Sequence, residues 1–320
     1  MLGISTCWWH NKIDRADRII DEILQLGLEG VELEYRITQS MYQEMKPRLK
    51  STLPVLSIHN FFPLPEGLGP EAASGDLYLL SSTDPEEHSR AVKYTIQTIE
   101  HAHDLQAKAV VLHLGRADMP SRADDLSRLY NSGKEYEKEA LSIVDEQRRT
   151  RQATGRKNMD AVLLSLEELN RAAEKKGVFL GIENRYHFHE IPNFEEIGLI
   201  LKTFRGGQLR YWHDVGHARV QENLGFLGHN DLLKAYSEEI IGVHLHDVRG
   251  LKDHLAPGQG EIDYEEMKPF LNPSVIKVLE LNARRVKRKD LVEGIRLIQT
   301  RGLGTLLNLL NSSNVKKLGR

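Results

Sequence analysis

The sequence contains a single cysteine, Cys7, among its 320 residues. One cysteine excludes an intramolecular disulfide and a cysteine-based zinc knuckle. No apolar run approaches the roughly 18 residues that a membrane-spanning helix needs. The N-terminal stretch MLGISTCWWHNK also lacks the basic and apolar regions of a signal peptide. These absences predict a cytoplasmic protein.

An excess of charge of one sign is also missing. The chain has 43 Lys and Arg against 46 Asp and Glu, which gives a formal net charge of -3. No global basic field therefore recruits nucleic acid or an anionic membrane, and neither is expected as a partner. A local basic groove remains compatible with this balance. Residues 8–14 lack a dinucleotide-binding glycine fingerprint, no P-loop occurs, and GQG at 258–260 is a lone GxG.

Short β-branched runs alternate with longer amphipathic stretches along the chain. Eight runs predict strands, over residues 2–8, 30–35, 54–61, 109–115, 178–184, 209–215, 240–247 and 275–282. Helical periodicity is clearest over residues 15–27, 86–105, 163–177 and 194–204. Eight βα units in a chain of this size predict an α/β fold, a single (β/α)8 TIM barrel over residues 1–302. A doubly wound sheet is the main competitor.

Two segments exceed a minimal barrel. Residues 116–160 are rich in charged side chains and are expected to form a helical extension after strand four, beside the barrel mouth. A surface helix pair without a role in chemistry is the alternative. Residues 303–320 form a C-terminal tail with a leucine cluster at 306–310. The tail packs either on the barrel or on a second subunit, so a homodimer stays open.

Polar side chains stand at the predicted carboxyl ends of the strands, where barrel enzymes hold their active sites. They are His59, Asn60, His113, Glu183, Asn184, Arg185, Asp214, His217, His244, His246, Asp247, Glu280 and Asn282. Carboxylates gathered in a partly dry funnel need nearby positive charge. The only basic residues within the strands, Arg210 and Lys277, lie away from these ends. A divalent cation is therefore expected, and carboxylates with imidazoles suit Mn, Zn, Co or Fe, with Mg less favoured as histidines are added.

The spacing of these residues sharpens the prediction. In DVGH, Asp214 ends a strand and His217 follows one helical turn later, so both can face one point. In HLHD, His244 and His246 lie on the same side of the strand by its period of two. His254 lies on a glycine-bounded loop that can fold back over the mouth. His213 and His246 also fit purely structural roles.

At these residues the chain resembles the xylose isomerase-like TIM-barrel superfamily, which includes sugar isomerases and epimerases, inosose dehydratases and endonuclease IV. The resemblance runs from GVELEY through HLHD and PGQGEID to VLELN. In the isomerase and epimerase branch it implies one cation held by Glu183, Asp214, His244 and Glu280. It also implies that the two glutamates move protons. The branch often has a further Glu where this chain has His189, next to Glu190, and an Arg where it has Gly250, next to Arg249.

Endonuclease IV implies a larger set for three zinc ions. Eight of its nine ligands match, at His59, His113, Glu183, Asp214, His217, His244, His254 and Glu280. The ninth, an aspartate, falls on Lys252, with Asp253 one step away. A lysine there would supply positive charge where a third cation needs negative charge.

The leading hypothesis is an enzyme, a divalent-metal-dependent isomerase or epimerase of a small sugar, sugar phosphate or cyclitol. It would abstract a proton next to a carbonyl and proceed through an enediolate, using one Mn, Zn, Co or Mg ion. Glu183 and Glu280 are the predicted catalytic groups. Substrate contacts are expected from His59, His113, Arg185, His217, His246, Arg249, His254 and Trp8. The alternatives are an endonuclease IV-like phosphodiesterase acting at abasic DNA with two or three zinc ions, and a barrel that binds a metabolite without catalysis.

Overall fold

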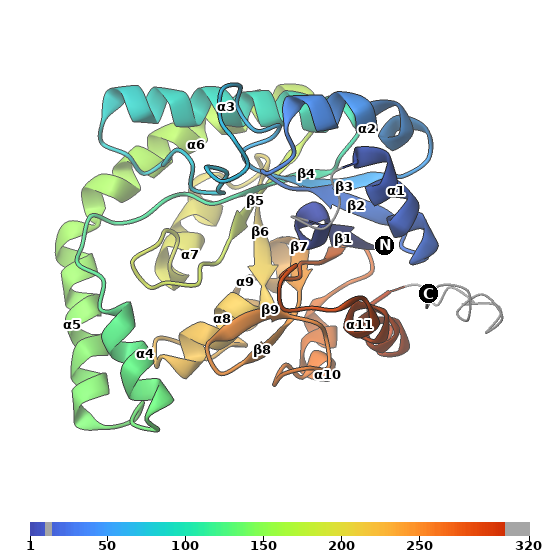
Figure 1. Ribbon diagram of the computed structural model, residues 1–320. Coiled ribbons are helices and arrows are strands. Elements are labelled where there is room, and N and C mark those ends of the chain that lie inside the picture. Colours follow the sequence, from blue (N-terminus) through green and yellow to red (C-terminus); the bar gives the residue numbers. More distant parts are fainter. Residues whose placement is uncertain (10–14, 305–320) are drawn as a thin grey trace.

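The computed structural model describes residues 1–9 and 15–304, and its centre is a closed barrel of eight parallel strands (Figure 1). Neighbouring strands pair in chain order, and the last strand closes the ring against the first. The strands are β1 (Leu2–Ser5), β2 (Gly30–Leu33), β3 (Val55–His59), β4 (Ala109–Leu112), β5 (Phe179–Glu183), β6 (Leu209–Asp214), β7 (Ile240–Leu245) and β10 (Ile276–Leu279). The predicted TIM barrel is confirmed.

Helices cover the outside of the barrel (Figure 1). They are α1 (Ala16–Gln25), α2 (Gln39–Ser51), α3 (Pro85–Asp104), α4 (Ala123–Asn131), α5 (Lys138–Thr154), α6 (Arg156–Lys176), α7 (Phe194–Thr203), α8 (Val215–Asn223), α9 (Asp231–Tyr236), α10 (Tyr264–Met267) and α11 (Arg288–Thr300). Single 3-10 turns occupy η1 (Thr6–Trp9), η2 (Ser237–Glu239) and η3 (Lys268–Phe270). In α1 the apolar residues Ile19, Ile20 and Ile23 face the strands and are buried, as the period of 3.6 predicts.

The lower part of the barrel interior is filled by buried apolar side chains. It comprises Leu56, Ala109, Val111, Trp212, Ile276 and Val278. The Trp212 ring fills the space beside Gly242, where an added Cβ would come within 2.1 Å of the ring. Glycine on β7 therefore makes room for tryptophan on β6. The centre of the Trp212 ring lies 5.1 Å from the centre of the His244 ring. These apolar side chains therefore form the apolar floor beneath the polar side chains of the barrel mouth.

The extension after β4 is helical, as expected, and α4 and α5 stand to one side of the barrel (green in Figure 1). A separate small hydrophobic core packs the extension against α8 and against a hairpin at the barrel mouth. That core contains Leu126, Leu129, Ala140, Ile143, Val144, Val220, Leu224, Phe226 and Val248. Arg151 of α5 also donates to the Phe188 carbonyl and pairs with Glu196, so α5 braces the loop after β5.

The seventh strand and one helix differ from the sequence expectations. The seventh strand ends at Leu245 rather than at 247, and the chain turns into an antiparallel hairpin of β8 (Asp247–Arg249) and β9 (Lys252–Leu255). The helix predicted over 163–177 begins earlier, at Arg156. The leucine cluster at 306–310 lies outside the described residues. Within the described ranges, no helix combines the length and apolar character needed to cross a membrane.

Candidate metal centre

Four side chains from neighbouring strand ends meet above the apolar floor. The Nδ1 atom of His244, on β7, lies 2.8 Å from Glu183 Oε1 and 2.9 Å from Glu280 Oε2. Asp214 Oδ2, at the end of β6, is 3.7 Å from the same nitrogen. One ligand atom from each of the four lies within 4.8 Å of the others. The sequence-predicted ligand set is therefore assembled, and we refer to it as the central group.

The chemistry of the central group fits a divalent cation. His244 Nδ1 can carry only one proton, yet three carboxylates surround it in a place that water hardly reaches. Glu183 Oε2 is buried and has no well-aligned hydrogen bond, although His113 Nε2 lies 2.9 Å away. Three carboxylates and one imidazole suit Mn, Zn, Co or Fe. A doubly charged ion at this point would compensate the excess negative charge.

The pKa values of the central group reflect the same crowding. Burial lowers the pKa of His244, but Glu280, Glu32 and Glu183 outweigh burial and raise that pKa well above its ordinary value. Burial raises the pKa of Glu183 and of Glu280, but the neighbouring histidines together outweigh it and hold each pKa well below the ordinary value. These are His244, His113 and His59 for Glu183, and His244 and His254 for Glu280. Any cation must therefore displace a proton from His244.

Glu32 of β2 supports His244 from the opposite side. His244 Nε2 lies 3.2 and 3.1 Å from the two oxygens of Glu32, which also accepts a hydrogen bond of 2.8 Å from Ser57. This contact places a proton on Nε2 and leaves Nδ1 to face the carboxylates. The sequence analysis did not single out Glu32. A glutamate at an inward position of an apolar strand was the signal that could have revealed it.

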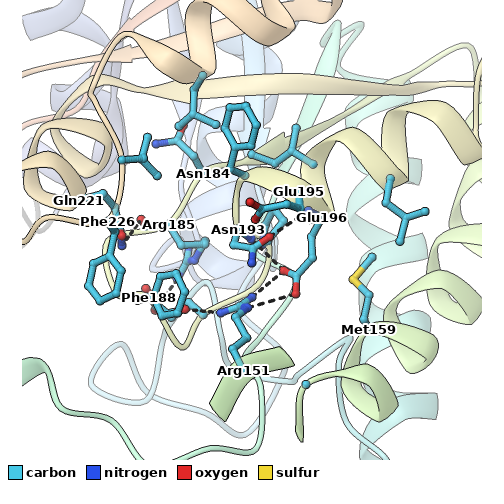
Figure 2. Close-up of a pocket in the computed structure, with 18 of the residues that line it drawn as sticks. Arg151, Met159, Asn184, Arg185, Phe188, Asn193, Glu195, Glu196, Gln221 and Phe226 are labelled. Atoms are coloured by element: carbon cyan, nitrogen blue, oxygen red, sulfur yellow. Dashed lines mark hydrogen bonds and ion pairs between the residues drawn. The ribbon is translucent and has the colours of Figure 1, made fainter. Parts of the chain in front are cut away.

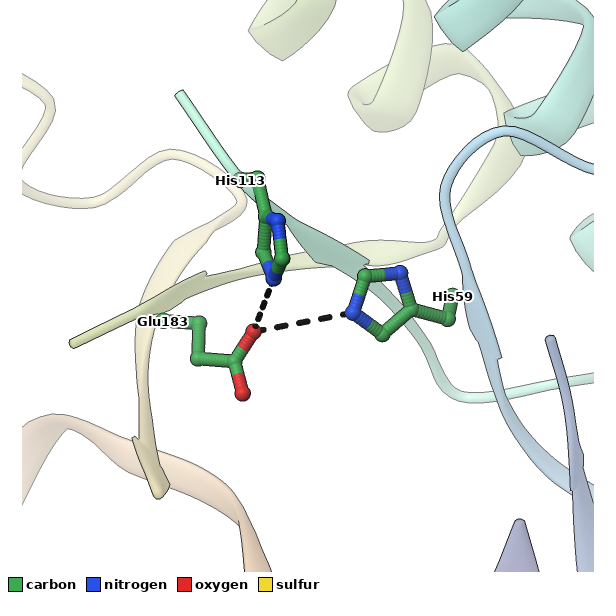
Figure 3. A group of neighbouring side chains, drawn as sticks. All are labelled: His59, His113 and Glu183. Carbon is green, nitrogen blue, oxygen red and sulfur yellow. Dashed lines mark ion pairs between the residues drawn. The ribbon is translucent and has the colours of Figure 1, made fainter. Parts of the chain in front are cut away.

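Two histidines extend the central group towards β3 and β4, and we call His59, His113 and Glu183 the β4-side group (Figure 3). His113 Nε2 and His59 Nε2 approach Glu183 Oε2 to 2.9 and 3.6 Å. Asp76, from the loop after β3, lies 3.0 Å from His113 Nδ1. Burial and Arg185 lower the pKa of His113, whereas Asp76 and Glu183 raise it, with a net value of about 9. Asp76 falls in an irregular loop, and no sequence pattern indicated it.

A third set lies towards the β8–β9 hairpin, and we call Asp214, His217 and His254 the hairpin-side group. Asp253 joins it, with Oδ2 3.1 Å from His254 Nδ1 and 4.0 Å from His217 Nε2. Lys252, which the sequence placed at this point, is instead exposed. The expectation of a positive charge here was wrong, because the hairpin register turns the next residue, an aspartate, inwards.

His246 does not lie where a substrate-contacting residue was predicted. It is fully buried, and Nε2 lies 3.0 Å from both oxygens of Asp214. Nδ1 accepts a hydrogen bond of 2.9 Å from the backbone N–H of His254. Both ring nitrogens thus have protein partners, and His246 fixes the orientation of Asp214. His213 is also internal: it contacts the Tyr211 hydroxyl, and burial lowers its pKa to about 3.

The three other predicted substrate contacts lie at different depths. Arg185 is buried, and its Nη2 lies 2.8 Å from Asp76 Oδ2 and 2.9 Å from Glu190 Oε1. Arg249 is exposed and donates to the Gln259 carbonyl at 2.6 Å. Trp8 is only 3% exposed and packs edge-on against Trp9, so its ring belongs to the core. The structure thus brings Arg185 close to the β4-side group and leaves Arg249 and Trp8 apart from it.

A groove of about 1200 Å³ lies outside the mouth, between α5, α6, α7 and α9 (Figure 2). Phe188 and Phe226 stack at 4.1 Å on one wall, and the Arg151–Glu196 ion pair crosses it. Arg185 is among its lining residues but uses its Nη2 on Asp76 and Glu190. None of the three metal-capable groups contributes a residue to the lining of this groove.

Several solved structures are similar to this chain over most of their length. The chain resembles the structure of 3-keto-D-glucoside 4-epimerase from E. coli at 14% identity, over 93% of this chain and 98% of that one, with a TM-score of 0.66. D-allulose 3-epimerase from Methylomonas sp. with D-allulose gives 14% identity, coverage of 94% and 96%, and a TM-score of 0.62. The IOLI protein with a zinc atom gives 15%, 94% and 96%, and 0.60.

The structural similarity shows that these proteins share the fold of this chain. No curated protein sequence matches the chain. The family model described as "Xylose isomerase-like TIM barrel" matches residues 20–301, which is most of the chain. The match spans the barrel from α1 to the end of α11 and includes every member of the three metal-capable groups. The chain therefore belongs to the xylose isomerase-like TIM-barrel family.

Proposed function

We propose that the protein is a divalent-metal-dependent isomerase or epimerase of a small sugar or related hydroxy-carbonyl compound. One observation carries the proposal: Glu183 and Glu280 converge on His244 Nδ1 from two sides of the barrel, at 2.8 and 2.9 Å. Their strands, β5 and β10, are separated in the ring by β6 and β7. Two carboxylates placed in this way can reach opposite faces of one substrate carbon.

In this proposal Glu183, Asp214, His244 and Glu280 hold the cation. When bound, the cation supplies Lewis-acid stabilisation of negative charge on the substrate oxygens. One glutamate removes the proton next to the carbonyl, and the other returns a proton to the opposite face of the enediolate. The apolar floor beneath them excludes water from the reacting carbon.

Two histidines at the mouth are placed to bind substrate oxygens. The side chains of His217 and His254 are 10% and 23% exposed, whereas His244 is fully buried. The structural relatives support a sugar substrate, since one contains D-allulose and another contains D-tagatose. Both are ketoses, whose carbonyl and neighbouring hydroxyl suit the proposed chemistry.

The test is solvent hydrogen exchange. The metal-loaded protein is incubated with a panel of ketoses and cyclitol ketones in D2O, and deuterium at the α-carbon is followed by NMR. We expect incorporation by the wild type and a loss of about 100-fold or more in Glu183→Gln and Glu280→Gln, because each removes a proton-transferring group. His213→Gln, which alters a buried histidine outside the ligand sets, is the control. Full exchange in both glutamine variants would contradict the proposed roles.

A specific observation also favours a second function, hydrolysis of a phosphodiester at abasic DNA. The β4-side and hairpin-side groups add two further candidate cation sites, and Asp253 supplies the negative charge that the sequence appeared to lack. Several zinc ions could activate water and stabilise a leaving oxygen. Elemental mass spectrometry of protein purified without chelators separates the two. About one ion per chain favours the isomerase, and two or three zinc ions favour the phosphodiesterase.

A further inference from the structure

The turn between β10 and α11 carries a concentration of positive charge. Residues 284–289 read RRVKRK, so five of six side chains are basic in a chain whose formal net charge is -3. Arg284, Arg285, Lys287 and Lys289 are exposed. The run begins four residues after Glu280 of the central group. The chain therefore has a local basic surface close to Glu280 of the candidate metal centre, although its net charge is negative.

Backbone contacts place this turn against the hairpin that carries His254. The Asn282 N–H donates to the His254 carbonyl at 2.9 Å. Arg285 Nη1 donates to the Asp253 carbonyl at 3.2 Å and lies 3.7 Å from Asp253 Oδ1. In Figure 1 the chain leading into α11 passes beside β9. The Arg285 guanidinium is thus separated from the hairpin-side group by a single carboxylate.

The basic side chains of the run differ in whether they already have an ion-pair partner. Arg288 pairs with Glu22 of α1 at 2.9 Å, and Lys289 lies 3.8 Å from Glu293 one turn further along α11, so both have carboxylate partners. Arg284 has no ion-pair partner among the described residues. Arg285 is 46% exposed and uses one of its five N–H donors in its hydrogen bond to Asp253. We call Arg284 and Arg285 the basic rim.

The other arginines next to the metal-capable groups are more firmly engaged. Arg185 is 5% exposed and lies between Asp76 and Glu190. Arg36, after β2, is 27% exposed and pairs with Glu34 at 2.7 Å. The basic rim is thus more exposed and keeps N–H donors available. An anion that approaches the mouth would meet these donors without having to displace a buried carboxylate.

We propose that the basic rim binds a phosphoryl group of the substrate, which makes the substrate a phosphate ester of a small sugar. The inference rests on the proposed isomerase function and deepens it. Loops after the last two strands of TIM barrels are a frequent place for phosphate binding, and the rim lies in the loop after the last strand. The planar fork of arginine matches phosphate oxygens in pairs. Glu183 and Glu280 then act on the carbonyl end, and the rim holds the other end.

Equilibrium binding tests the proposal without requiring turnover. Titration calorimetry compares ribulose with ribulose 5-phosphate, fructose with fructose 6-phosphate, and inorganic phosphate, on the metal-loaded protein. The test variant is Arg284→Gln with Arg285→Gln. The control is Lys289→Gln with Arg296→Gln, which removes the same charge from exposed positions on α11. We expect at least one ester to bind about tenfold or more tightly than its free sugar, since arginine–phosphate contacts are strong charge-assisted bonds. The test variant should lose this preference and the control should keep it.

Several results would overturn the inference. Equal affinity for esters and free sugars would do so, as would a preference that survives in the Arg284/Arg285 variant. Failure of the wild type to bind any ester or inorganic phosphate would do so too. Rim-dependent binding of an abasic DNA duplex, with no binding of the esters, would replace it by the nuclease function. Deuterium exchange on a phosphate ester by the Arg284/Arg285 variant, at the wild-type rate and with the wild-type KM, would refute the rim while leaving the proposed isomerase intact.

Discussion

Replacing Glu32 with glutamine is expected to weaken metal binding without touching a ligand of the cation. The Glu32 side chain is fully buried, and its oxygens lie 3.2 and 3.1 Å from His244 Nε2. A carboxylate in this position holds the proton on Nε2 and makes Nδ1 a better electron donor. The amide of glutamine has nearly the same shape but carries no charge, and it can present an N–H to Nε2 instead of an oxygen.

The expected loss follows from this geometry. Removing the partner that orients a ligating histidine commonly costs about 10- to 100-fold in metal affinity. That range corresponds to about 1.4 to 2.7 kcal/mol of binding free energy. Glu32→Ala should lose at least as much, because it also leaves the Ser57 hydroxyl and His244 Nε2 without their shared acceptor.

The assay is a competition titration of Zn or Mn against a chelator of known affinity, at constant pH. Glu34→Gln is the matched control. It removes a buried carboxylate two residues along the chain, but that carboxylate pairs with Arg36 at 2.7 Å rather than with a member of the central group. We expect the control to bind metal like the wild type. Wild-type affinity in Glu32→Gln would refute the role given to Glu32, and equal losses in both variants would show that the effect is not specific to the carboxylate that contacts His244.

Three further outcomes are expected. Gly216→Ala would place a methyl group 2.0 Å from the His246 ring, so the ring must move away from Asp214. Thermal unfolding should show that the free energy of unfolding falls by about 1–3 kcal/mol, and metal affinity should fall too. His254 has a φ of 53°, and in thermal unfolding His254→Gly should stay within about 1 kcal/mol of wild-type stability, because relieved strain and added chain entropy offset each other. The KM for the ketose should rise in this variant, because the imidazole is placed to bind substrate oxygens. Apparent metal affinity should rise from about pH 6 to about pH 8, because the carboxylates around His244 raise its pKa and the cation must displace that proton; a pH-independent affinity would contradict the ligand set.

The barrel could be predicted from sequence because eight short and mostly buried apolar runs alternate with amphipathic helical stretches. The strand-end positions placed the members of the central group among the polar candidates, and the resemblance to the xylose isomerase-like family singled out these four as one ligand set. Glu32 was missed because a single charged residue within an apolar run looks like a break in the strand pattern rather than a functional side chain. Asp76 and Asp253 were missed for a different reason. Their positions depend on an irregular loop and on the register of a hairpin, and neither has a periodicity that the sequence displays.

Gly75 has a consequence for the rate at which metal reaches the centre. An added Cβ at Gly75 would stand 2.7 Å from His113 Nδ1 and 2.9 Å from His59 Cε1, so the loop after β3 lies directly on both rings. The side chain of His59 is only 2% exposed, whereas that of His254 is 23% exposed. Metal exchange at the β4-side group therefore requires this loop to lift, and exchange at the hairpin-side group does not. If zinc occupies both of these groups, as the phosphodiesterase alternative requires, a chelator should remove it in two phases, and the slow phase should report the opening of the loop.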